Sequence, residues 1–203
     1  MIYEYADDGS WLAIVAAVFV VEVLTILLIR PISANSRVWY KHFGLVAVIA
    51  DVGIILLGFA VSRYAFLAYG TASYTPWSNA AIFSCTLLWL QIVHDLAYYH
   101  IFVKRVLSTS TNGIVLFMRK YGSEGELWPV VGDSIMVVAS GLLAHALSRV
   151  APHVSVAMLI AALYVVPYMV SPDFSAAAPR PDKPGESAVG AAAQVQGVRV
   201  VKW

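Results

Sequence analysis

Seven polar residues interrupt stretches of the sequence that are otherwise apolar and long enough to lie inside a membrane. They are Glu22, Asp51, Gln91, His94, Asp95, Asp133 and His145. Ionisable side chains are expensive in a bilayer and usually face the interior of a helical bundle, so they are candidates for a functional site. Between Gln91 and Tyr98, an amide, an imidazole, a carboxylate and a phenol recur at helical spacing and share one face of a helix.

These residues permit two interpretations. We expect a single intramembrane polar network composed of Asp51, Gln91, His94, Asp95, Tyr98 and Asp133. In one interpretation His94 passes protons between the carboxylates, and the network is a path for protons or ions. In the other, the groups pair as hydrogen bonds between helices, each contributing about 0.6 kcal/mol. The second is favoured, because the sequence has neither the broken helices nor the inverted repeat typical of transporters.

The residue patterns of common enzymes and metal sites are missing from the sequence. It contains no H-E-x-x-H, no G-x-S-x-G and no glycine-rich phosphate loop, and Cys85 is its single cysteine. His94 and His100 are six residues apart, so in an α-helix they would lie on different faces rather than bind one metal ion. The net charge of +1 leaves no basic surface for nucleic acid. We therefore expect a protein that is not an enzyme, with no catalytic, cofactor-binding or metal-binding residues and no nucleic-acid partner.

Five apolar segments must position the polar residues. The chain is 60% hydrophobic and 12% charged with a mean hydropathy of +0.76, whereas about a quarter of a soluble domain is charged. Crossing ~30 Å of hydrocarbon takes about 20 apolar residues in a helix. The sequence therefore predicts an all-α, polytopic transmembrane bundle over residues 1–170, with spans at residues 11–29, 43–62, 80–103, 128–150 and 154–170. The fifth segment is short and contains Pro167, so a re-entrant or surface-lying segment is its alternative.

The basic residues predict an orientation. All but two of the 13 Lys and Arg residues follow the first or third segment or lie in the C-terminal tail; Arg63 and Arg149 are assigned to the opposite side. By the positive-inside rule, the N-terminus is outside and the C-terminus is cytoplasmic. The first ten residues lack the basic start of a signal peptide, so we expect the first segment to be retained.

Two further segments flank the predicted spans. Residues 113–121 carry apolar side chains at helical spacing after Thr111 or Asn112, which predicts a short interfacial amphipathic helix. Residues 171–203 form an Ala/Pro-rich extended tail that cannot build a core of its own. Its last ten residues favour β-structure, so we expect the tail to contact a partner by adding a strand to its sheet. The contacting residues would be Val195, Val198, Val200 and Trp203.

Three motifs between residues 93 and 144 carry a family resemblance. They are the His94-Asp95 pair followed by two tyrosines, the run Arg119-Lys-Tyr-Gly122, and Gly132-Asp-Ser134 at the start of a span. This stretch resembles small polytopic membrane proteins of nucleocytoplasmic large DNA viruses. The resemblance implies a structural, minor capsid-associated virion protein, which anchors the capsid shell to an internal membrane derived from the host endoplasmic reticulum. It implies the lipid bilayer and capsid or other virion membrane proteins as partners.

Two other functions stay open at this point. The polar network is compatible with a small proton- or ion-conducting membrane protein. An accessory subunit of an organellar membrane complex would have the same architecture, and its tail would also contact neighbouring proteins.

Overall fold

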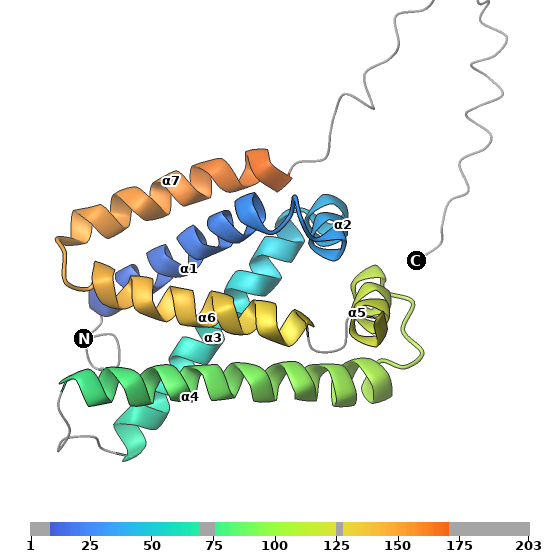
Figure 1. Ribbon diagram of the computed structural model, residues 1–203, viewed down its shortest axis with the longest axis horizontal. Coiled ribbons are helices and arrows are strands. Elements are labelled where there is room, and N and C mark those ends of the chain that lie inside the picture. Colours follow the sequence, from blue (N-terminus) through green and yellow to red (C-terminus); the bar gives the residue numbers. More distant parts are fainter. Residues whose placement is uncertain (1–8, 70–75, 125–127, 171–203) are drawn as a thin grey trace, which may run out of the picture. The chain divides into compact units, whose positions relative to one another are not determined.

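The computed structural model describes residues 9–69, 76–124 and 128–170, and over these residues all regular structure is helical. Five helices are long and apolar enough to cross a membrane, which confirms the all-α prediction with five potential spans and a multi-pass membrane protein. In chain order the elements are α1 (Gly9–Leu28), α2 (Ala34–Phe43), α3 (Leu45–Tyr69), α4 (Pro76–Ala97), its π-helical continuation η1 (Tyr98–Val106), α5 (Gly113–Glu124), α6 (Trp128–Leu147) and α7 (Pro152–Val170) (Figure 1).

Helix α1 lies at the centre of the bundle. It packs against α3, α6 and α7, while α4 packs against α3 and α6. Its buried face is lined by small side chains, among them Ala13, Ala16 and Ala17. Small residues let helix backbones approach closely, which is how helices associate where lipid removes the hydrophobic driving force. The bundle core is thus built on α1.

The outward faces of the other long helices remain strongly apolar. Large side chains are exposed on each of them, including Ile49 on α3, Trp89 on α4, Leu142 on α6 and Tyr164 on α7. A water-soluble monomer rarely exposes so much contiguous apolar surface. Helices with apolar residues on all sides are those of a protein that is surrounded by lipid.

Arg63 differs from its predicted position. The predicted second span ends at residue 62, which would place Arg63 in the loop before the third span. Helix α3 instead continues to Tyr69, and the Arg63 side chain is fully buried (0% exposed). Its guanidinium carbon lies 4.8 Å from the centre of the Trp11 ring, a cation–π contact between α3 and α1. Arg63 is therefore a structural residue inside the bundle and does not count as a loop charge.

Helices α2 and α5 lie at one end of the long helices, on the right in Figure 1. Ser33 caps α2 by accepting a hydrogen bond from the Ser36 backbone amide at 3.2 Å. Gly44 ends it with a φ of 55°, a left-handed conformation that glycine adopts easily, and α3 begins at the next residue. This sharp turn folds α2 against the start of α3.

Helix α5 begins where the sequence analysis placed a cap, since the Asn112 side chain accepts a hydrogen bond from the Ile114 amide at 2.9 Å. Phe117 on its inner face stacks on Trp39 of α2, with ring centres 5.3 Å apart. α5 thus packs on the protein, and its position relative to a membrane surface stays a prediction.

At the same end of the bundle, the Arg30 guanidinium donates a hydrogen bond to the Met169 carbonyl of α7.

The fifth predicted span forms a continuous helix through Pro167. The tail, including the predicted contact residues Val195, Val198, Val200 and Trp203, lies outside the described residues.

Candidate functional site

A cavity of about 480 Å³ opens between α2, α3, α4, η1, α5 and α6. Three aspartates from three different helices line it: Asp51 of α3, Asp95 of α4 and Asp133 of α6. The rest of its polar lining consists of Lys104 and of aromatic and imidazole groups, namely Trp39, His94, Tyr98, Tyr99, His100 and Tyr121. The remaining surface is largely aliphatic, so the cavity combines an apolar body with a few converging polar groups, as small-molecule sites do.

Asp51 is held by two donors from α2. The Trp39 indole nitrogen donates to Asp51 Oδ2 at 2.9 Å, and the Tyr40 hydroxyl donates to the same oxygen at 3.2 Å. Burial raises the pKa of Tyr40, and the charges of Asp51 and Glu22 raise it further. Tyr40 therefore stays protonated and remains a hydrogen-bond donor at every physiological pH.

Asp95 anchors a second group of polar side chains on α4. Its Oδ1 accepts a hydrogen bond from the Gln91 side-chain amide at 2.8 Å and lies 3.1 Å from His94 Nδ1. The His94 ring stacks on Tyr98, with centres 5.8 Å apart and planes inclined by 15°. Asp95 Oδ2 is buried and has no hydrogen-bond partner among the described residues. This oxygen therefore has hydrogen-bonding capacity that no described residue uses.

A second cavity, of about 500 Å³, shares part of its wall with the first. Trp39, Asp51, Met118, Tyr121 and Asp133 line both cavities. Burial raises the pKa of Tyr121, and the negative charges of Asp133 and Asp51 raise it further. The two aspartates thus lie in the wall that the cavities share, and Tyr121 lies in the same wall.

The structure brings together the residues of the predicted polar network. Asp51, His94, Asp95, Tyr98 and Asp133 line the same cavity, and Gln91 joins it through its bond to Asp95. Their chemical role stays a prediction. His145, by contrast, lies near the end of α6 and lines neither of the two cavities.

Sequence reasoning missed several residues of the site. Trp39 and Tyr40 were not among the predicted site residues, yet both are buried and donate to Asp51. Glu22 was one of several polar residues in the spans; its side chain is fully buried (0% exposed), and its charge acts on Tyr40. The contacts of Trp39 and Tyr40 with Asp51 arise from the packing of α2 against α3.

The π-helix η1 also went unpredicted. In it the Leu107 amide bonds the Phe102 carbonyl five residues back, at 2.8 Å. His94 of α4 and His100 of η1 nevertheless line the same cavity. Short π-helical stretches occur frequently at functional sites.

Chemically, the arrangement offers carboxylates, an imidazole and phenols around a cavity large enough for a small ligand. Among the residues that the structure describes, no group of three or more His, Cys, Asp or Glu side chains has a geometry that could hold a metal ion. These side chains can provide hydrogen bonds and electrostatic contacts to a ligand. Comparison with protein-family models, with curated proteins and with solved structures finds no match to this chain.

Proposed function

We propose that this protein is a structural membrane protein of a large DNA virus, which anchors the capsid shell to the internal lipid membrane of the virion. In this role it would be a minor capsid-associated component rather than an enzyme. The long helices would lie in the bilayer, while one end of the bundle and the tail would contact capsid or other virion membrane proteins.

The observation that carries the proposal is the position of the basic residues. Exposed Lys and Arg side chains gather on α2, on η1 and on α5, at the end of the bundle where these elements lie (Figure 1). They are Arg37, Lys41, Lys104, Arg105 and Lys120. An apolar bundle with one basic end suits a protein that is embedded in a membrane and is contacted from one side only. The sequence resemblance to virion membrane proteins supports the same role.

The proposal requires this basic end to face the cytoplasm, where the shell assembles. Cysteine labelling tests the orientation in a Cys85→Ala background, with Thr109→Cys in the turn after η1 and Ala151→Cys in the turn before α7. Both positions are exposed. We expect a membrane-impermeant maleimide to label Thr109→Cys on sealed microsomes, whose cytoplasmic face is outward, and to label Ala151→Cys only after permeabilisation.

The two variants control for each other, because both must react fully once the membrane is dissolved in detergent. The reverse pattern on sealed microsomes would place the basic end in the lumen and contradict the proposed orientation. Labelling of both sites from one side would contradict the membrane topology itself.

A further inference from the structure

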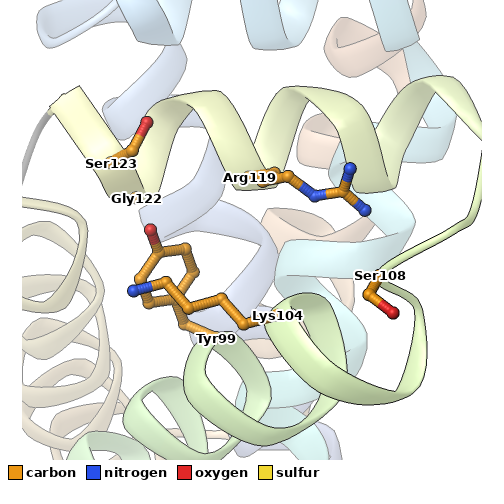
Figure 2. A pocket seen from close by; sticks show the side chains of 6 residues that line it. All are labelled: Tyr99, Lys104, Ser108, Arg119, Gly122 and Ser123. Carbon is orange, nitrogen blue, oxygen red and sulfur yellow. The ribbon is translucent and has the colours of Figure 1, made fainter.

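A further, open pocket lies beside the acidic cavity, between η1 and α5 (Figure 2). It has a volume of about 540 Å³ and is lined by Tyr99, Lys104, Ser108, Arg119, Gly122 and Ser123. Two of these residues are cationic and two are serines, whereas no acidic residue lines the pocket. Arginine, lysine and hydroxyl groups together are the side chains that bind phosphate.

The cations of this pocket are held in place by the fold. An Arg119 guanidinium nitrogen donates to the Leu107 carbonyl at 2.8 Å, which fixes one edge of its planar group. The Lys104 ammonium lies 4.5 Å from the centre of the Tyr99 ring. Each cation thus makes one contact that orients it, and each still has further N–H donors for a ligand.

The basic pocket and the acidic cavity are adjacent. Tyr99, Lys104 and Gly122 line both of them, so the two share a wall. Three aspartates line the acidic cavity, and Asp95 has a buried oxygen without a hydrogen-bond partner among the described residues. Aromatic rings beside carboxylates are the usual environment of a bound ammonium group, through ion pairing and cation–π attraction.

From this arrangement we infer that the protein binds a zwitterionic phosphate ester that carries an ammonium group, such as phosphoethanolamine. The phosphate lies against Lys104 and Arg119, and the ammonium group enters the cavity beside Asp95 and Asp133. Because the pocket is at the end of apolar, membrane-length helices, the headgroup of a phospholipid is the source that fits its position. A soluble ester with the same groups is the other source.

Binding to purified full-length protein in detergent tests this inference. The ligands are phosphatidylethanolamine, phosphatidylglycerol, which has the phosphate without the ammonium group, and soluble glycerophosphoethanolamine. Native mass spectrometry gives the affinity of each. We expect phosphatidylethanolamine to bind about tenfold more tightly than phosphatidylglycerol, as the loss of a charged hydrogen bond predicts. Tighter binding of the lipid than of the soluble ester assigns the source to the membrane, and equal binding assigns it to the soluble ester.

Matched variants separate the two halves of the site. Lys104→Gln and Arg119→Gln should each lower the affinity for both lipids about tenfold, because each substitution removes a phosphate contact. Asp133→Asn should lower the affinity for phosphatidylethanolamine alone. Arg105→Gln is the control, since Arg105 is an exposed cation next to Lys104 that lines neither pocket.

Gel filtration confirms that each variant remains folded before binding is compared. Equal affinity of the unmodified protein for the two lipids would overturn the inference. Equal losses of lipid affinity in Lys104→Gln and Arg105→Gln would also overturn it. So would an Asp133→Asn variant that binds phosphatidylethanolamine as tightly as the unmodified protein.

Discussion

Gly122→Ala should destabilise the protein, although alanine is the better helix former. A Cβ atom at residue 122 would overlap the ring of Tyr99, so either α5 must move away from η1 or the ring must leave its place. Overpacking of this kind costs about 1–3 kcal/mol, against a gain of about 1 kcal/mol in helix propensity. We expect a lower unfolding temperature in detergent and weaker binding at the pocket between η1 and α5.

Gly132→Ala is the matched control. Gly132 is also a helical glycine, but nothing lies within 4 Å of a Cβ atom built there, so the substitution should leave stability unchanged or raise it slightly. Removal of the Tyr99 ring should relieve the overlap in the destabilised variant. The Gly122→Ala, Tyr99→Ala double variant should therefore lose less unfolding free energy than the sum of the losses in the two single variants. Equal unfolding temperatures for Gly122→Ala and Gly132→Ala would refute the close packing of α5 on η1.

Asp51→Ala should destabilise the bundle because it leaves two donors of α2 without an acceptor. Both Trp39 and Tyr40 are buried, and both donate to Asp51. An unsatisfied buried polar group costs about 1–3 kcal/mol, and α2 would lose its link to α3. Thermal unfolding in detergent, followed by tryptophan fluorescence, should show a lower midpoint and an altered emission from Trp39.

Asp51→Asn distinguishes hydrogen bonding from charge. Its side-chain oxygen can still accept from α2, while the negative charge near Glu22 and Asp133 disappears. We expect this variant to keep the stability of the unmodified protein or exceed it. If Asp51→Asn were as unstable as Asp51→Ala, the carboxylate charge rather than the hydrogen bonds would hold α2.

The spans were predictable from the sequence because each is an apolar run of membrane length. The length of the apolar run placed the end of the second span too early. Arg63 was expected to begin a loop, yet its side chain is buried and contacts the ring of Trp11. A charge that is paired inside a bundle cannot be recognised by hydropathy alone.

The polar side chains of α4 and of the first residue of η1 were also predictable, because Gln91, His94, Asp95 and Tyr98 share one face by spacing alone. The aromatic donors to Asp51 were not predictable, because the turn at Gly44 must fold α2 against α3 before they can contact the aspartate. Tyr99, His100 and Lys104 also line the cavity, and all three lie in η1, whose π-helical turn no residue pattern in the sequence predicts.

Quantitative mass spectrometry of purified virions, before and after detergent extraction of the internal membrane, tests whether the protein anchors the shell to the bilayer. We expect the protein to be present in many copies per particle and to stay with the shell until the bilayer dissolves. Its absence from particles, or its release while the bilayer is intact, would contradict the anchoring role.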